Sequence, residues 1–204
     1  MHAVRVPAPD RPSPAITRIL AAARGCLGAT GVAGLSTRAV AEAAGVPLSQ
    51  IHYHFGSKRG LVLAVLRDEN DALVARQRAM FEGSGSFTEK WDRACDYLED
   101  DLGSGYVRRL HELFGQAYGD PELAAEMAEL VLAWHRAIAD LVRRSISPAT
   151  LERTGLTPES LAALAGAAFL GAESSILIGL GEDRLPIRAG LRRVGRWIAM
   201  LEGD

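Results

Sequence analysis

The chain has 204 residues, 48% of them hydrophobic and 24% charged, and its formal net charge is −2. This composition is typical of a globular protein with a substantial core, and it excludes a wholly disordered chain. The near-zero net charge argues on its face against a nucleic-acid binder, although a total can hide an uneven distribution.

The hydrophobic pattern is helical almost throughout, and the sequence contains no convincing strand pattern or long-period repeat. Four prolines and no hydrophobic run occur in residues 1–14, so we expect residues 1–13 to form a disordered arm rather than a signal peptide. A first helix is predicted over residues 15–29, with Gly31 ending it. Ser36 predicts the start of a second helix over 37–44. Pro47 lies in the first turn of a predicted third helix, which ends near Phe55. A fourth helix is predicted from residue 58 to about residue 81.

Further helices are predicted over 88–102, 105–118, 121–146, 158–180 and 188–202. The clearest start is Asp120-Pro121, with an aspartate as N-cap and a proline in the first turn. Residues 161–180 carry one charge, that of Glu173, and are long enough to span a membrane. We favour a buried or interface helix, because polar residues follow Glu173 and no aromatic belt flanks the segment.

Two short helices joined by a tight glycine turn, after a longer helix, have the helix-turn-helix layout. Val40, Ala41 and Ala44 lie on one face of the first short helix, and Ile51 and Phe55 of the second pack against them. The outward residues of the second helix are then polar or aromatic, a set that suits base edges and phosphates. They are Leu48, Ser49, Gln50, His52, Tyr53 and His54.

The run from Leu35 to Leu61 resembles the DNA-binding signature of the TetR family of bacterial transcriptional regulators. With the first helix, the resemblance covers residues 14–66. It implies that Thr37 and Arg38 contact the DNA backbone or a base, and that the outward set above faces the major groove. It also implies that Lys58 grips a phosphate at the start of the fourth helix. Pro47 and His52 depart from the family, which usually has Ser and Tyr there.

Charge separates the two parts of the chain. Residues 1–60 hold seven basic and two acidic residues, whereas the remainder holds 16 basic and 23 acidic residues. A basic segment attached to an acidic remainder is expected of a DNA-binding domain on a separate body. We therefore predict an all-α protein with a three-helix DNA-binding domain over residues 14–61 and a helical-bundle domain over 62–204.

The resemblance implies that the second domain dimerises and encloses a small ligand. Candidate ligand-binding residues are the aromatic, polar and sulfur-containing side chains of the middle helices, although plain core packing is an alternative for each: Trp91, Tyr97, His111, Phe114, Tyr118, Met127, Trp134 and His135. Small and hydrophobic residues of the last two helices are candidates for a dimer interface: Leu164, Ala168, Gly171, Ala172, Ile176, Leu191, Val194 and Ile198. Glu173 could contact either a partner subunit or a ligand.

These features predict a cytoplasmic, ligand-responsive regulator. It would be a homodimeric repressor that binds a palindromic operator in double-stranded DNA and is released by a small-molecule effector. An activator or an architectural DNA-binding protein of the same fold is the alternative. No catalytic motif is visible, so an enzyme is not expected. Neither a cofactor nor a metal is expected, since His52 and His54 are two residues apart rather than four. The two cysteines suggest reduced thiols.

Overall fold

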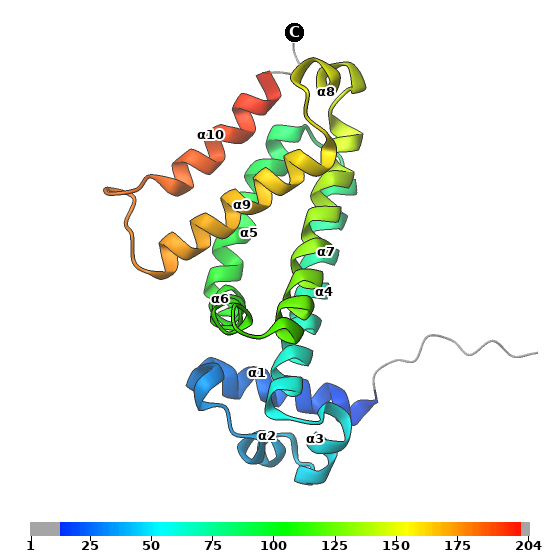
Figure 1. The fold of residues 1–204 in the computed structure, drawn as a ribbon, viewed down its shortest axis with the longest axis vertical. Helices are drawn as coiled ribbons and strands as arrows, with labels where there is room; N and C mark the ends of the chain where they lie inside the picture. The colour runs from blue at the N-terminus through cyan, green and yellow to red at the C-terminus, as the bar shows by residue number, and fades with distance from the viewer. Residues whose placement is uncertain (1–12, 201–204) are drawn as a thin grey trace, which may run out of the picture. The chain divides into compact units, whose positions relative to one another are not determined.

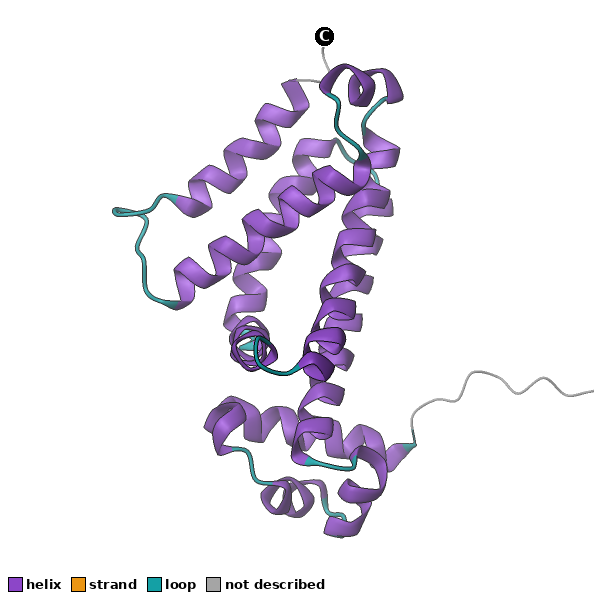
Figure 2. Ribbon diagram, viewed as in Figure 1, coloured by secondary structure: helices purple, strands orange, loops and turns teal. Residues whose placement is uncertain are grey.

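A computed structural model describes residues 13–200, apart from the side chains of residues 198 and 199. Within this range the chain forms ten helices and no strand (Figures 1 and 2). The predicted all-α fold class is thereby confirmed. The contacts divide the chain into two compact units, and the boundary along the chain lies between Arg67 and Asp68. The sequence places the domain boundary at 61/62, six residues earlier and near the start of the same helix.

The first unit contains α1 (Pro14–Gly34), α2 (Thr37–Ala44), α3 (Leu48–Phe55) and the beginning of α4 (Lys58–Glu82). Gly31 interrupts α1 with a φ of 68°, at the residue where the sequence predicts its end. The α1–α2 and α2–α3 pairs pack against each other. Val40 and Ile51 are fully buried where the two short helices meet, so the predicted inward faces are those observed.

Local caps explain the bounds of α2 and α3. The Ser36 hydroxyl accepts a hydrogen bond from the Ala39 amide and so caps α2. Gly45 ends the helix with a φ of 63°, a left-handed conformation that favours glycine. Pro47 precedes α3 as its N-cap residue, one position before the predicted first turn. Its fixed φ and missing N–H cost little there, since no intrahelical bond is lost.

The second unit contains the rest of α4 together with α5 (Phe87–Gly103), α6 (Tyr106–Ala117), α7 (Pro121–Ser145), α8 (Pro148–Thr154), α9 (Pro158–Leu177) and α10 (Ile187–Met200). α7 packs on α6 and α9, and α10 packs on α5 (Figure 1). The short helix α8 was not predicted, although Ser147 and Pro148 give it the same kind of start signal that opens α7.

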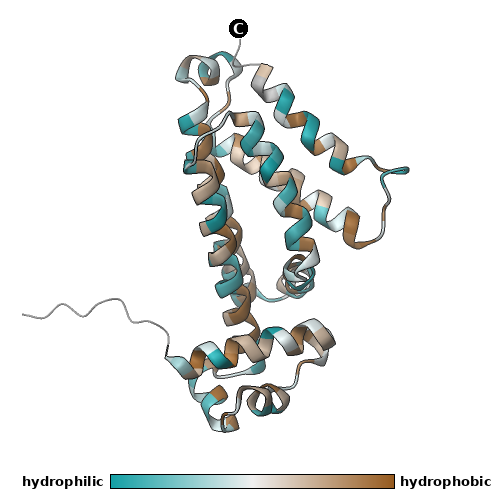
Figure 3. Ribbon diagram, turned by 180° about the vertical axis from the view of Figure 1, so that it is seen from behind, coloured by the Kyte–Doolittle hydropathy of each residue, from teal (hydrophilic) through white to brown (hydrophobic). Residues whose placement is uncertain are grey.

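A hydrophobic core contains residues of α4, α5, α7, α9 and α10. Its buried members are Phe81, Phe87, Trp91, Cys95, Leu98, Leu141, Ala172 and Leu191. The Trp91 indole N–H donates to the Leu191 carbonyl at 2.7 Å, which satisfies a buried donor. A Cβ on Gly195 would overlap the Trp91 ring, so α10 approaches this tryptophan through a residue with no side chain. α10 has both hydrophilic and hydrophobic turns (Figure 3).

α9 is the one helix of the described residues that is long and apolar enough to cross a membrane. Only 17% of the most apolar 18-residue stretch of α9 is buried within this single chain. It nevertheless packs on α7, and two of its polar side chains, Glu173 and Ser174, bond to His111 of α6. α9 is thus integrated into the bundle on one side and presents hydrophobic surface on another.

Candidate nucleic-acid interface and ligand cavity

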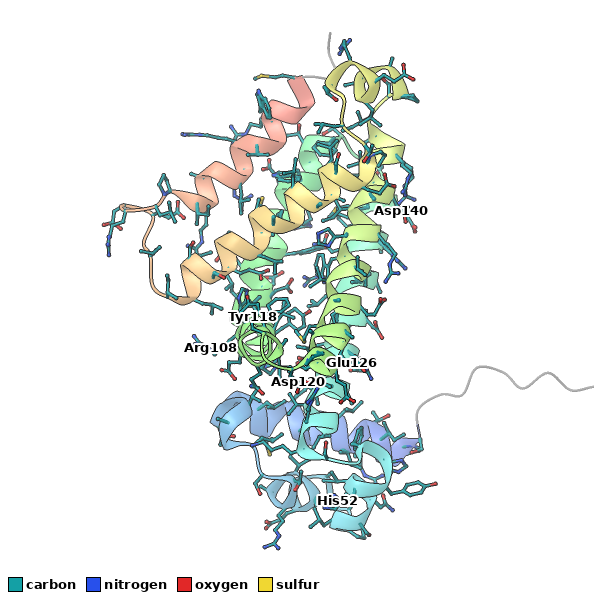
Figure 4. The ribbon with its side chains drawn as sticks, viewed as in Figure 1. His52, Arg108, Tyr118, Asp120, Glu126 and Asp140 are labelled. Atoms are coloured by element: carbon teal, nitrogen blue, oxygen red, sulfur yellow. The ribbon has the colours of Figure 1, made fainter. Side chains whose placement is uncertain are left out.

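The outer surface of α3 has the features expected of a recognition helix. Ser49, His52 and Tyr53 are exposed, Tyr53 to 84%, while Leu48, Gln50 and His54 are half-buried. At the start of α2, Thr37 is half-buried and Arg38 is exposed. Figure 4 shows His52 on α3. All the residues predicted to contact DNA therefore lie on this three-helix unit with some accessible surface.

Neighbouring contacts already hold several of these side chains. The His52 Nδ1–H donates a long hydrogen bond of 3.4 Å to the Gly56 carbonyl, at the end of the same helix. The Tyr53 and His54 rings meet edge to face at 5.0 Å. The Gln50 Oε1 atom is buried and has no hydrogen-bond partner among the described residues. A bidentate contact from Gln50 to adenine therefore requires its amide to turn outward.

Lys58 has a structural contact that the sequence did not predict. Its Nζ donates to the Ala33 carbonyl at 2.7 Å, near the end of α1. This hydrogen bond joins the start of α4 to the last turn of α1, where a cation also interacts favourably with the helix dipole. An ammonium group has three N–H donors, so two remain for a phosphate.

Gly60 fixes how α4 leaves α3. A Cβ at this position would overlap the Phe55 carbonyl oxygen, so α3 and α4 approach as closely as a glycine permits. The Ser57 hydroxyl accepts a hydrogen bond from the Gly60 amide at 3.0 Å and caps α4. The orientation of α3 relative to α4 therefore depends on Gly60, which lies just outside α3.

The second unit encloses a cavity of about 600 Å³. Its wall includes residues from α4 to α10 and is overwhelmingly hydrophobic. A volume of this size lies within the range of small-molecule sites. Six aromatic side chains contribute to the wall, namely Phe81, Phe87, Trp91, Tyr106, Trp134 and Phe169, and Trp197 lies at an exposed part of it.

The cavity includes three of the eight predicted ligand-binding residues: Trp91, Trp134 and His135. Met127 is buried elsewhere in the unit, and Tyr118 is 90% exposed at the carboxyl end of α6 (Figure 4). Tyr97 lies beneath the Arg76 guanidinium, which stands 3.9 Å from its ring centre. His111 and Phe114 meet edge to face outside the cavity wall.

Sequence reasoning missed most of the polar groups in the wall. Asn70 is buried, and its Oδ1 accepts hydrogen bonds from the Tyr106 hydroxyl at 2.8 Å and the Trp134 indole N–H at 3.0 Å. Burial raises the pKa of Tyr106, with Glu173 and Asp101 adding to the effect. Gln77 is also buried, and its Oε1 has no partner among the described residues. Both residues lie in α4, which has many charged residues, so the sequence contains no clear signal of their burial.

Two carboxylates complete the wall. Asp101 accepts a hydrogen bond from Arg76 at 2.7 Å, and burial raises the pKa of Asp101 to about 6 although Arg76 opposes the shift. Glu173 Oε2 accepts a hydrogen bond from His111 Nε2 at 3.0 Å. The other ring nitrogen of His111 lies 3.3 Å from the Ser174 hydroxyl. A neutral imidazole satisfies both contacts, with Nε2–H as donor and Nδ1 as acceptor.

The predicted dimer residues fall into two groups. Leu164, Ala168, Gly171 and Val194 are exposed, and Ile176 is half-buried. Ala172 and Leu191 are buried in the core of their own unit, at 0% and 4% exposure, so their side chains are not available to a partner. Apolar periodicity does not distinguish these two faces, because both are hydrophobic. The Ile198 side chain lies outside the described residues.

Within the described residues, neither cysteine is part of a disulfide. Burial raises the pKa of the Cys95 thiol to about 11, which keeps it protonated near neutral pH. Cys26 is also a free thiol. The part of the chain that the structure describes contains no group of three metal-ligating side chains close enough to hold an ion.

Comparison with known proteins supports the reading of the first unit. Residues 19–65 match the model of the tetR family of bacterial regulatory proteins. A curated relative is the HTH-type transcriptional regulator UidR of Escherichia coli K12, which is 29% identical over 113 residues. The match covers 55% of this chain and 52% of UidR, so the chain spans about half the length of the curated relatives it matches.

Solved structures share the fold over most of the chain. A TetR-family regulator from Rhodococcus sp. superposes with a TM-score of 0.70 at 24% identity, over 92% of this chain and 98% of its own. FadR from Bacillus subtilis, solved with stearoyl-CoA, gives a TM-score of 0.65 at 12% identity, over 88% of this chain and 96% of its own. Residues 19–65 are therefore similar to the DNA-binding segment of the tetR family of bacterial regulatory proteins, and the chain shares the fold of solved regulators described as members of that family.

Proposed function

We propose that the protein is a ligand-responsive transcriptional repressor of the cytoplasm. As a homodimer it binds a palindromic operator in double-stranded DNA, and a small molecule in the cavity of the second unit releases it. The observation that carries this proposal is the presence, in one chain, of a basic helix-turn-helix unit and a hydrophobic cavity of about 600 Å³. FadR, which has the same fold, was solved with a small molecule bound.

The proposed DNA contacts lie on α2, α3 and the start of α4. Arg38, Ser49 and Tyr53 are exposed and need no rearrangement to reach DNA. His52 is also exposed, and its ring donates to the Gly56 carbonyl. Lys58 supplies its remaining N–H donors to a phosphate. Gln50 and His54 read base edges once their side chains turn outward.

The proposed dimer surface lies on α9 and α10. Leu164 and Trp197 line the cavity and are 61% and 63% exposed. A partner subunit on this face would cover these large hydrophobic side chains, which soluble proteins rarely expose together. Two such surfaces in a symmetric pair contact each other through the same residues. Two recognition helices about 34 Å apart then match half-sites one helical turn apart.

Ligand release follows from differential binding to two conformations. A ligand that fits the cavity better when the two DNA-binding units are wrongly spaced lowers operator affinity by the ratio of its two affinities. A coupling of about 1–3 kcal/mol is typical, which corresponds to about 5–150-fold in operator affinity.

The test is binding of the full chain to DNA from the region upstream of its own gene, measured by fluorescence anisotropy at moderate salt. Tyr53→Ala should weaken operator binding without affecting folding, because the side chain is 84% exposed. Tyr118→Ala removes an equally exposed tyrosine from the other unit and should leave binding unchanged. Failure to bind this DNA, or equal binding to scrambled DNA, would contradict the proposal. The second result would favour an architectural role.

A reporter gene placed behind the bound DNA separates repression from activation. Expression should rise when the gene for this protein is deleted. A fall in expression would identify an activator instead.

A matched pair of variants tests the dimer. Leu164→Glu should produce a monomer in sedimentation equilibrium, because it places a charge within the proposed interface. Leu132→Glu introduces the same charge at a 46% exposed leucine of α7 and should leave the dimer intact. A wild-type monomer, or identical behaviour of both variants, would contradict the assignment of this surface.

A further inference from the structure

The charged residues in the cavity wall are acidic. Asp101 and Glu173 are its charged wall residues, and within the described chain the wall contains no lysine or arginine. An anionic ligand in this hydrophobic space would meet like charge at low effective dielectric, which is costly. The wall therefore disfavours carboxylates and phosphates and favours a cation.

The two carboxylates differ in how far they are neutralised. Asp101 pairs with the Arg76 guanidinium at 2.7 Å. Glu173 pairs with His111, whose two ring nitrogens are both satisfied when the imidazole is neutral. No arginine or lysine of the described residues lies within ion-pair distance of Glu173. Glu173 is thus the carboxylate of the cavity wall that has no arginine or lysine as a partner, which makes it the one available to a cationic ligand.

An unpartnered acceptor independently indicates a ligand. Gln77 is 3% exposed and is part of the cavity wall, yet its Oε1 atom has no hydrogen-bond partner among the described residues. Leaving a buried acceptor unpaired is unfavourable, so such an atom is best explained by a donor that enters the cavity. With Glu173 it forms a set of acceptors that calls for N–H donors.

The aromatic wall is suited to the same ligand. Trp91 and Trp134 line the cavity, and indole rings attract cations as well as hydrophobic surface. We propose that the cavity binds a hydrophobic amine in its protonated form. Glu173 holds the ammonium group, an N–H or O–H group of the ligand donates a hydrogen bond to Gln77 Oε1, and the apolar body lies within the aromatic wall. This inference rests on the proposed function, since it names the chemical class of the effector.

Direct binding tests the proposal without DNA. All three tryptophans of the chain, Trp91, Trp134 and Trp197, belong to the cavity wall, so their fluorescence reports on its occupancy. Decylamine, decanol and decanoic acid have chains of equal length and differ in the charge of the head group. At pH 7 we expect decylamine to bind about tenfold or more tightly than decanol, the effect of one charge-assisted hydrogen bond. Decanoic acid should bind most weakly.

A charge-neutral variant and a matched control assign the effect to one residue. Glu173→Gln keeps an acceptor for His111 and should reduce decylamine affinity to that of decanol, with decanol binding unchanged. Glu129→Gln makes the same substitution at an exposed carboxylate of α7 and should change nothing. Circular dichroism confirms that both variants fold.

Three results would overturn the proposal: no binding of decylamine, decanoic acid binding as tightly as decylamine, or an amine preference that survives Glu173→Gln. A chain that binds its upstream DNA but shows one of these results disproves the ligand class alone. A chain that binds decylamine but no DNA disproves the proposed regulator alone.

Discussion

The Lys58 ammonium group donates a hydrogen bond to the Ala33 carbonyl across 25 residues of sequence. This contact joins α1 to α4, the two longer helices that precede and follow the helix-turn-helix in the chain. The same side chain is the one that the family resemblance assigns to a phosphate. One lysine is thus placed to serve both the folding of the first unit and its binding to DNA.

Lys58→Ala should therefore have two measurable effects. The free energy of unfolding should fall by about 1 kcal/mol, the usual net value of such a hydrogen bond. Affinity should fall about equally for operator and scrambled DNA, and the slope of log affinity against log salt should decrease by about 1. Arg38→Ala removes a charge but not this hydrogen bond, so chemical denaturation should show unchanged stability. An unchanged salt slope for Lys58→Ala would limit the residue to a structural role.

Gly60→Ala should disturb the recognition helix from outside it. The added Cβ would overlap the Phe55 carbonyl oxygen, so α3 and α4 must separate, at a cost of about 2 kcal/mol or more in unfolding free energy. Operator affinity should also fall, since α3 is displaced.

Gly25→Ala is the control for this substitution. Gly25 is exposed inside α1, and a Cβ there would meet nothing within 4 Å. Alanine is the better helix former, so stability should rise by about 0.5–1 kcal/mol with DNA binding unchanged. Thermal unfolding of both variants measures the pair. Equal effects of the two substitutions would contradict the close approach at Gly60.

The helix-turn-helix was predictable because its determinants are local. Ser36, Gly45 and the inward set led by Val40 and Ile51 act within a few residues of sequence, through caps and short-range packing. The cavity was not predictable in the same way. Met127 and Trp134 occur at equivalent helical spacings on α7, yet the first is in the core and the second in the cavity wall. Only long-range packing decides between these environments.

The polar residues of the cavity show the same limit. Asn70 and Gln77 lie in a long helix whose sequence is polar along much of its length, so their burial is invisible to periodicity. Glu173 stood out as the single charge of an apolar segment, but its partner, His111, is 62 residues away. A partner subunit and a ligand were therefore equally consistent with the sequence.

Gln50→Ala should relax base preference at one position of each half-site. Loss of a bidentate contact to adenine costs about 1–3 kcal/mol of discrimination there and leaves the other positions unaffected. Binding to a set of single-base operator variants measures this. A uniform loss of affinity across all variants would show instead that Gln50 supports the position of α3, since its Oε1 is buried in the free protein.

Asp101 should make the folded state less stable as pH rises from about 4 to about 6. Burial raises the pKa of Asp101 to about 6 in the folded protein, from an ordinary value of 3.8, despite the facing Arg76 and with Asp100 and Glu173 reinforcing the rise. Between these values the folded chain holds a proton that the unfolded chain has lost, so stability falls with increasing pH. The loss attributable to this group is at most about 3 kcal/mol.

Comparison with Asp101→Asn isolates this contribution, because asparagine does not titrate. The unfolding free energy of the variant relative to wild type should rise from pH 4 to pH 6.5 and then level off, as measured by urea denaturation at each pH. Asp100→Asn removes the neighbouring carboxylate, which is 66% exposed, and its difference from wild type should vary much less. A difference between Asp101→Asn and wild type that stays constant or falls over this range would show that the attraction of Arg76 outweighs burial and that the pKa of Asp101 is not raised in the folded protein.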